Sequence, residues 1–421
     1  MTDGRTDATT VTSLRVRNRA TVLQHIVLAR RTTRADIARD CGLSAASAAN
    51  IVADLIGEGL VHENGTRSSQ GGRPIAVIEP RPDGASAIGA DIGERGVAVE
   101  LFDFAMNRID TEFRGGQAEE DIDAITRDLR DAIAAIRERN PEVCSNLVGI
   151  GLGLPGVVET DESGKQTLYA KSNGWPPIAV DELLAVDVPV FGQNGAQALA
   201  QAEVWFGAAR GVEYAVVALL GRGVGAGIVL EGRLTRGPHS SATEWGHTKI
   251  ERHGRLCRCG NTGCVEAYLG AGSILDAWRE AGGEFEGTGW GALGRLFELA
   301  RDGDAVAERV VDDVIDSLGT ALGSLVNLDN PERVVIGGWV GIRMLEFIGD
   351  RLVDAIRRNS LDRPGQQFEL VGSTFGGDAV ALGSAIAPFE ELIQRARPQR
   401  DEPLEALTDS AGAPGSGAMM S

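Results

Sequence analysis

From residue 85 onward, short apolar runs that end in glycine turns alternate with longer amphipathic stretches, and this alternation constrains the fold most. The apolar runs predict buried strands, and the stretches between them predict helices. Such a mixture is typical of α/β layers, so we expect two α/β lobes with a cleft between them. Strands are expected at 86–93, 97–102, 147–154, 188–191, 215–220, 224–230 and 333–336, and helices at 122–137 and 305–328.

The chain of 421 residues is too long for one ordinary domain, and its length predicts two or three. Its formal net charge of −19 argues against a protein that coats nucleic acid or an anionic membrane with its whole surface. The charge is uneven, because residues 1–80 hold 10 Arg against 8 Asp plus Glu, whereas the remaining 341 residues carry −21. This asymmetry fits a small DNA-facing module on an acidic body.

No apolar run approaches the roughly 18–20 residues that a membrane-spanning helix needs. The N-terminus also lacks the apolar core of a signal peptide. We therefore expect no membrane partner and a cytoplasmic location. Three of the five cysteines, Cys257, Cys259 and Cys264, fall within eight residues, and in a reducing compartment this clustering indicates metal ligation rather than disulfides.

The N-terminal part has the pattern of a helix-turn-helix. Residues 1–13 are polar and are predicted to be disordered, and an apolar stripe around Val22 then marks a first helix. A short Thr-capped helix, a break at Gly42-Leu43 and a second helix capped by Ser44 follow. In this arrangement the Ser44-capped helix would enter the major groove of DNA.

A wing is predicted directly after the second helix. Residues 59–63 predict a strand, and 75–78 predict the returning strand. The tip between them would run from Asn64-Gly65 to Gly71-Gly72. Residues 14–80 are therefore expected to form a winged helix-turn-helix DNA-binding domain; the alternative is a small helical domain that packs on a protein partner.

Small polar side chains suit DNA contacts on the exposed side of the second helix. Ser44, Ser47 and Asn50 can hydrogen-bond base edges and phosphates. In the wing, Arg67 is expected on a phosphate. Arg73, which follows two glycines, could enter a narrow A·T-rich minor groove.

Several blocks of the body follow one another in a fixed order. With the N-terminal module they resemble the ROK family of repressors, uncharacterised reading frames and sugar kinases, and within it the xylose- and N-acetylglucosamine-type repressors. The resemblance covers about residues 14–390. It rests on Gly-Leu-Pro-Gly (153–156), Gln193-Asn194-Gly195, Gly221–Gly227, Glu244-Trp245-Gly246-His247, Cys257-Arg258-Cys259-Gly260-Asn261-Thr262-Gly263-Cys264-Val265-Glu266 and Ile336-Gly337-Gly338.

The resemblance implies the fold and one ligand set. The body, residues 81–396, is expected to be a sensor domain of two actin/hexokinase-like, ribonuclease-H-like lobes. The tail at 397–421, rich in Pro, Ala, Gly and Ser, is expected to be disordered. Positions that match the family's sugar contacts are Asn194, Glu244, His247 and Glu266. The family's usual Ala-Gly-Glu is replaced here by Ala242-Thr243-Glu244.

A structural Zn²⁺ site is expected beside the sugar contacts. His247 with Cys257, Cys259 and Cys264 makes a tetrahedral Cys₃His set, which is closed to substrate. His247 could ligate the metal through one ring nitrogen and meet a sugar hydroxyl through the other. The alternative is three buried thiols and an unrelated histidine.

The kinase chemistry of the family is expected to be lost. The family's kinases carry Asn-Asp where this chain has Asn194-Gly195, and glycine cannot act as the general base. Their phosphate-holding Asp-x-Gly-Gly-Thr corresponds to Asp91–Gly96, which places Glu94 close to phosphates. Their Gly-Thr-Gly turn is Gly221-Arg222-Gly223. We therefore expect no enzyme activity, and a sugar phosphate with Arg222 as its counter-charge is one hypothesis for the effector.

The favoured interpretation is a sugar- or sugar-phosphate-responsive transcriptional regulator, most simply a repressor of carbohydrate genes. It would bind palindromic operator DNA as a homodimer or higher oligomer. Two alternatives stay open: an active ATP-dependent sugar kinase with a fused regulatory head, and a ligand-blind DNA-binding scaffold controlled by a protein partner.

Overall fold

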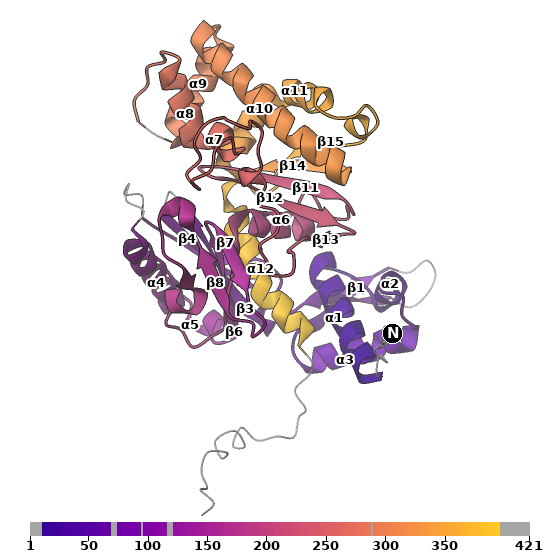
Figure 1. The fold of residues 1–421 in the computed structure, drawn as a ribbon. Coiled ribbons are helices and arrows are strands. Elements are labelled where there is room, and N and C mark those ends of the chain that lie inside the picture. Colours follow the sequence, from indigo (N-terminus) through magenta and orange to yellow (C-terminus); the bar gives the residue numbers. More distant parts are fainter. Residues whose placement is uncertain (1–10, 69–73, 94–95, 116–120, 288, 396–421) are drawn as a thin grey trace, which may run out of the picture.

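The computed structural model describes residues 11–68, 74–93, 96–115, 121–287 and 289–395. It shows a helical head at the N-terminal end and two α/β lobes (Figure 1). The expected mixed α/β class is confirmed, and so are the helix-turn-helix and the two-lobed body.

The head consists of three helices and a two-stranded sheet. Thr33 and Ser44 cap the second and third helices, because their hydroxyls accept from the N–H groups of Asp36 and Ser47. The apolar faces of these elements meet in one core that includes Leu23, Ile37 and Leu55. The elements are α1 (Val11–Ala29), α2 (Arg34–Asp40), α3 (Ala45–Gly57), β1 (Val61–Arg67) and β2 (Ile75–Pro80).

Two boundaries in the head differ from the sequence prediction. The helix α1 begins at Val11, inside the stretch expected to be disordered. The strand β1 continues through Asn64-Gly65, which we had placed at the hairpin tip. The pairing register shifts between Glu63 and Thr66, which indicates a β-bulge. Gly65 has φ 79° in this bulge, so the Asn-Gly pair forms a bulge within the strand instead of a hairpin turn. Gly71-Gly72 and Arg73 lie outside the described residues.

The first lobe is built on a five-stranded sheet of order β10-β6-β3-β4-β5, in which β6 pairs in parallel with both β3 and β10. The helix α4 covers one face, and a small sheet, β7-β8-β9, flanks it. The elements are β3 (Ser86–Gly93), β4 (Gly96–Asp103), β5 (Arg108–Arg114), α4 (Ile122–Arg139), α5 (Pro141–Cys144), β6 (Leu147–Leu154), β7 (Val157–Thr160), β8 (Gln166–Tyr169), β9 (Ile178–Ala179) and β10 (Val190–Asn194).

The strand predicted at 188–191 is shifted toward the C-terminus. It begins at Val190 because Pro189 has no N–H to give to the ladder. It ends with Gln193 and Asn194, whose polarity had argued against a strand, but which pair with Gly153 and Leu154.

The second lobe has a sheet of order β13-β12-β11-β14-β15 under a layer of helices (Figure 1). The hairpin predicted around Gly221–Gly223 forms as expected, with Leu220 paired to Val224. The elements are β11 (Ala215–Leu220), β12 (Val224–Leu230), β13 (Arg233–Leu234), α7 (Glu266–Leu269), α8 (Ala271–Glu280), α9 (Gly289–Arg301), α10 (Ala305–Asp329), β14 (Arg333–Gly337), α11 (Gly338–Arg358) and β15 (Glu369–Gly372).

Two crossing helices, α6 (Gly195–Phe206) and α12 (Ala379–Gln394), join the three parts. A Cβ atom at Gly383 of α12 would lie 1.8 Å from the carbonyl oxygen of Ala198, so only glycine permits this crossing. The far ends of both helices enter the core of the head. Trp205 of α6 and Phe389 and Ile393 of α12 share one apolar cluster with Leu23 of α1. In Figure 1, α12 runs from the centre of the molecule to the head.

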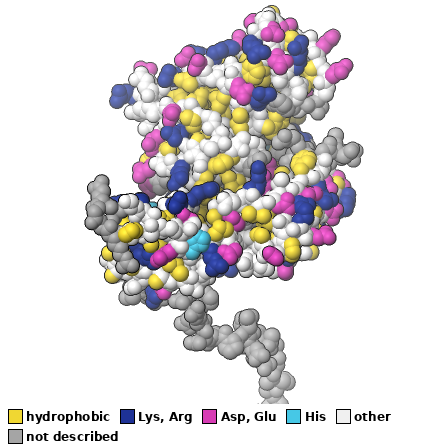
Figure 2. Space-filling view, turned by 180° about the vertical axis from the view of Figure 1, so that it is seen from behind, with side chains coloured by type: hydrophobic (Ala, Val, Ile, Leu, Met, Phe, Trp, Pro, Cys, Tyr) yellow, Lys and Arg dark blue, Asp and Glu magenta, His cyan; other side chains and the backbone are white. Residues whose placement is uncertain are grey.

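The reverse face in Figure 2 shows basic and acidic side chains interspersed rather than gathered by sign. Local pairs explain part of this pattern, since Arg139 contacts Asp110 at 2.9 Å and Glu112 at 2.8 Å. Among the described residues, no helix is both long and apolar enough to cross a membrane.

Candidate functional site

A cavity of about 620 Å³ lies between the two sheets. The ends of β3, β6 and β10 line it from the first lobe, and the turn at Gly221–Gly223 lines it from the second. The four predicted sugar contacts all line this cavity, as does Arg222. Residues that the sequence interpretation assigned to one site, although they are distant in the chain, thus line one cavity.

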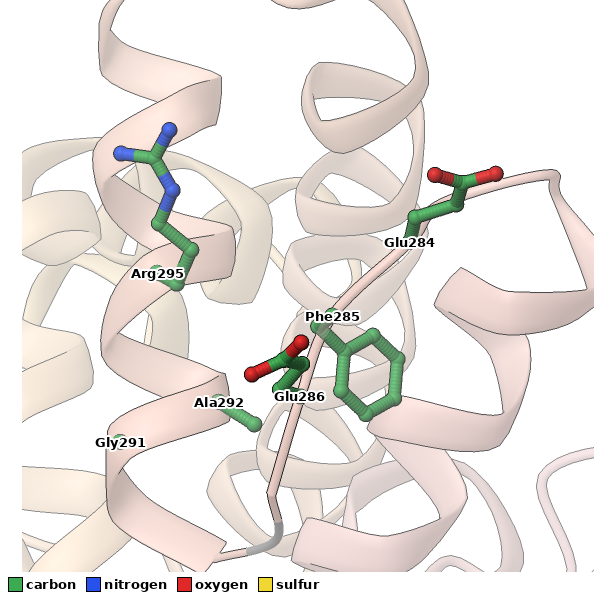
Figure 3. Close-up of a pocket in the computed structure, with 6 residues that line it drawn as sticks. All are labelled: Glu284, Phe285, Glu286, Gly291, Ala292 and Arg295. Atoms are coloured by element: carbon green, nitrogen blue, oxygen red, sulfur yellow. The ribbon is translucent and has the colours of Figure 1, made fainter.

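A second hollow, of about 390 Å³, lies beside α9 (Figure 3). The guanidinium of Arg295 and the carboxylate of Glu284 point away from each other in this view, so no polar groups converge on a bound molecule. The first cavity is thus the better candidate site. The hollow is lined by Glu284, Phe285, Glu286, Gly291, Ala292 and Arg295.

Asn194 stands at the point where β10 becomes α6. Its side-chain oxygen accepts from the Ala196 N–H at 2.8 Å and caps the helix. Its side-chain nitrogen donates to the carbonyl oxygen of Gly156, also at 2.8 Å. These bonds fix the amide at the cavity wall and leave one N–H and one lone pair toward a ligand.

Glu244 and Glu266 bring two carboxylates to the cavity. Burial raises the pKa of Glu244, the nearby charge of Glu266 adds to this, and His247 opposes it. Oε2 of Glu266 accepts from the Val224 N–H at 3.1 Å, which ties this carboxylate to the hairpin turn. Thr243, directly before Glu244, has φ 70°, a left-handed conformation that is costly for a β-branched residue.

The four predicted metal ligands converge. The candidate ligand atoms of His247, Cys257, Cys259 and Cys264 all lie within 4.8 Å of one another, so this cluster could hold a metal ion. Nδ1 of His247 is 3.7 Å from Sγ of Cys257, and Sγ of Cys259 is 3.8 Å from Sγ of Cys264. A tight turn makes this possible, because a Cβ atom at Gly263 would lie 1.6 Å from the Glu251 carbonyl oxygen.

The thiols of the cluster have unequal acidity. Burial raises the pKa of Cys257 to about 12. Burial also opposes ionisation of Cys259, but hydrogen bonds from Asn261 and the neighbouring thiols outweigh it and lower the pKa to about 7. The ammonium of Lys249 donates to Sγ of Cys264 at 2.9 Å. The lowered pKa of Cys259 favours its thiolate, the form that ligates metal.

In the head, the predicted DNA contacts are partly engaged in local structure. The hydroxyls of Ser44 and Ser47 lie 2.9 Å apart in the N-cap of α3, whereas Asn50 is exposed on the same helix. Arg67 lies 3.4 Å from Asp36. A hydrogen bond from Thr33 lowers the pKa of Asp36, so this carboxylate stays charged beside Arg67.

Comparison with known proteins decides the family. Residues 87–388 match the ROK family. The chain belongs to the ROK family. The xylose repressor of Caldicellulosiruptor bescii is 30% identical over 91% of this ROK protein and 98% of its own length. The glucokinase of Halalkalibacterium halodurans is 31% identical, but over 70% of this chain and 92% of its own.

A solved structure supports the same assignment. It is described as a ROK family transcriptional regulator, homologous to the E. coli MLC protein, and it superposes with a TM-score of 0.71 at 25% identity. The superposition covers 90% of this chain and 97% of that chain. The ROK fold and the likeness to sugar repressors predicted from the motifs are thereby confirmed.

The positions that the resemblance matched to the phosphoryl-transfer residues of the family's kinases can now be located in the structure. Gly195 is the first residue of α6, and a Cβ atom there would have no neighbour closer than 3.9 Å. A side chain would therefore fit, so packing does not demand glycine. Asp91 and the Gly221–Gly223 turn line the cavity, and Glu94 lies outside the described residues.

Sequence reasoning gave no role to many cavity residues, among them Lys171, Arg258 and Trp339. Nη2 of Arg258, in the loop that carries the cysteine cluster, donates to the carbonyl oxygen of Ser172 in the first lobe at 2.9 Å, so this loop contacts the first lobe beside the cavity. Trp339 directly follows the glycines at 337–338, and that position could have drawn attention to it.

Proposed function

We propose that this protein is a DNA-binding transcriptional regulator, most simply a repressor, that responds to a sugar or sugar phosphate and carries no kinase activity. One observation carries the proposal. The cavity keeps the hydroxyl-binding groups Glu244, His247 and Glu266, but its wall has Gly195 where a kinase needs a proton acceptor. The repressor and regulator relatives support the regulatory assignment.

A structural Zn²⁺ fits the His247, Cys257, Cys259 and Cys264 cluster, because three sulfurs and one imidazole form a closed tetrahedral set. The ion would hold the loop against the cavity. Nδ1 of His247 faces Cys257, which leaves Nε2 for a sugar hydroxyl. Metal analysis of the purified protein should find one zinc per chain, and a Cys264→Ala variant should lose it.

We infer that the two crossing helices, α6 and α12, transmit sugar binding from the cavity to the head. Both α6 and α12 begin at the cavity, at Gly195 and Ala379, and end in the core of the head. A sugar that prefers one arrangement of the lobes would shift the placement of the head. The head would bind a palindromic operator as part of a homodimer in the cytoplasm, with Ser44, Ser47, Asn50 and Arg67 at the DNA and Arg73 in an A·T-rich minor groove.

Arg222 is the proposed contact for a phosphate, should the effector carry one. The test is calorimetry with glucose and glucose 6-phosphate. The phosphate ester should bind more tightly to the wild type and lose that advantage in Arg222→Ala. Equal heats for the two ligands would remove this role from Arg222.

The regulatory proposal is tested with DNA selected from a random pool by the full chain. The wild type should bind the selected DNA, and a sugar should change that affinity at least about fivefold, a coupling of about 1 kcal/mol. DNA binding that responds to no sugar would instead favour the ligand-blind scaffold.

The glucokinase relative favours one alternative, an active sugar kinase. ADP release is measured with glucose, xylose and N-acetylglucosamine. We expect none above background. Phosphorylation at an enzymatic rate would contradict the proposal, and Gly195→Asp, which has room for its side chain, is the variant in which a trace activity would rise.

A further inference from the structure

Trp339 lines the same cavity as the sugar contacts but comes from the first turn of α11. The backbone before it is fixed, because Gly338 has φ 76° and a Cβ atom there would lie 2.3 Å from the carbonyl oxygen of Leu220. Only glycine permits this approach. The direction in which the Trp339 indole leaves the backbone is therefore determined by the end of β11.

The indole covers one end of the hairpin turn. Its Nε1 is 3.3 Å, and its Cδ1 3.7 Å, from the point that a Cβ atom of Gly221 would occupy. At the other end of the turn, Oε2 of Glu266 is 3.1 Å from the corresponding point on Gly223. Trp339 and Glu266 thus flank the two ends of the same three-residue turn, and both line the cavity.

The cavity is too large for one sugar ring. A monosaccharide displaces roughly six or seven water molecules, or about 200 Å³ in all. The cavity of about 620 Å³ leaves room for at least a second ring. The lining of the cavity also includes Leu219, Gly338, Gly376 and Gly377. Sugar rings carry C–H groups on their faces and hydroxyls at their rims, so an indole in the cavity wall suits a ring face.

We propose that the Trp339 end of the cavity is a second sugar subsite and that the effector is a disaccharide or longer oligosaccharide. Its first ring is held by Glu244, His247 and Glu266, and its second ring stacks on Trp339. The proposal rests on the proposed function, because it takes the cavity to be the effector site. It makes Trp339 the residue that selects for chain length.

The test is calorimetry on the full-length, metal-loaded protein with xylose, xylobiose, glucose, cellobiose and glucose 6-phosphate. One of the two disaccharides should bind the wild type about fivefold to tenfold more tightly than its monosaccharide. In Trp339→Ala this advantage should vanish, while the monosaccharide Kd stays within about twofold. Trp339→Phe, which keeps a ring face, should retain part of the advantage.

Two control variants separate the subsite from general damage. Leu328→Ala, a change at an exposed apolar side chain outside the cavity, should leave both affinities unchanged. Glu266→Gln should weaken monosaccharide and disaccharide by the same factor, since it acts on the first ring.

Three results would overturn the proposal. They are equal wild-type affinities for one ring and two, a disaccharide advantage that survives Trp339→Ala, and tight binding of glucose 6-phosphate alone. Failure of the proposed function looks different: a ligand-blind scaffold would bind none of the five ligands, and an active kinase would release ADP with a sugar.

Discussion

Thr243 concentrates local strain next to a proposed ligand contact. The family usually has glycine here, and the structure gives the physical reason, since the backbone stays left-handed, at φ 70°, although the side chain is β-branched. The strain lies one residue before Glu244, so it is part of how that carboxylate is placed.

We predict that Thr243→Gly stabilises the protein by about 1 kcal/mol, because the relief of strain exceeds the added chain entropy. Urea unfolding measures it. The control is Thr248→Gly: Thr248 has φ −69° and its hydroxyl donates to the Trp245 carbonyl oxygen, so this variant should lose stability. A loss in both variants would contradict the assignment of strain to position 243.

The carboxyl group of Glu390, on α12, is partly buried and contacts Gln201 of α6. Burial raises its pKa, and both Arg236, 3.8 Å away, and Trp205 oppose this. Its contribution to stability is therefore fully present below its ordinary pKa of 4.5 and is lost as the pH rises through the raised value.

We predict that Glu390→Gln removes this loss. Gln cannot ionise, and it can still accept the hydrogen bond that Gln201 donates to Oε1. The free energy of unfolding of the variant, minus that of the wild type, should increase as the pH rises above 4.5. Glu391→Gln, at an exposed neighbour, should show no such trend. A difference that is constant with pH would show that Glu390 does not titrate in this way.

At the scale of elements, the close crossing of α6 and α12 depends on the absence of a side chain at Gly383. Gly383→Ala places a Cβ atom 1.8 Å from the Ala198 carbonyl oxygen, in backbone that cannot move without separating the helices. We predict a loss of about 3 kcal/mol. Gly349→Ala, in α11 with open space around it, should instead gain about 0.5–1 kcal/mol from helix propensity. Thermal unfolding measures the change in stability of each variant. Changes of the same sign and similar size in both variants would refute the packing argument.

Local signals predicted most of the elements. The caps at Thr33 and Ser44, the hairpin at Gly221–Gly223 and the Cys₃His spacing are all set by residues near in sequence, and the structure has them as expected. The prediction of the hairpin tip was wrong; it also rested on a local signal, but that signal was ambiguous. Asn64-Gly65 reads as a turn or as a bulge, and only the pairing partner across the sheet decides.

Contacts between distant segments could not be predicted from the residues alone. Trp339 and Gly221 are separated by more than a hundred residues, and no periodicity reports that an indole covers that turn. The cluster of Trp205, Phe389 and Leu23 likewise arises from three helices that each read as ordinary amphipathic segments. The resemblance supplied the candidate sugar contacts, but it did not indicate the other residues that line the cavity, such as Trp339.

At the scale of the whole molecule, the core of the head continues into the first lobe, although most of the first lobe's sheet packs in a cluster of its own. Phe389 is fully buried and stacks edge-on against Phe104 of the first lobe, with ring centroids 5.4 Å apart. The same cluster contains the core of the head, whereas the helices of the second lobe pack in a separate cluster.

We predict that Phe389→Ala costs about 3–5 kcal/mol and opens the head and first lobe together. Hydrogen exchange should rise in α3 and in β3 by similar factors, while α10, in the second-lobe core, changes least. Exchange that rises in β3 but not in α3 would show that the head folds independently.

The way α1 is seated on α12 has a consequence for protein engineering. A head that packs on α12 of its own chain cannot simply be exchanged for the head of another protein. A chimaera that grafts a foreign head onto this sensor would present unmatched apolar side chains to Phe389 and Ile393. Such a graft should succeed only when the final turns of the C-terminal helix come from the same donor as the head.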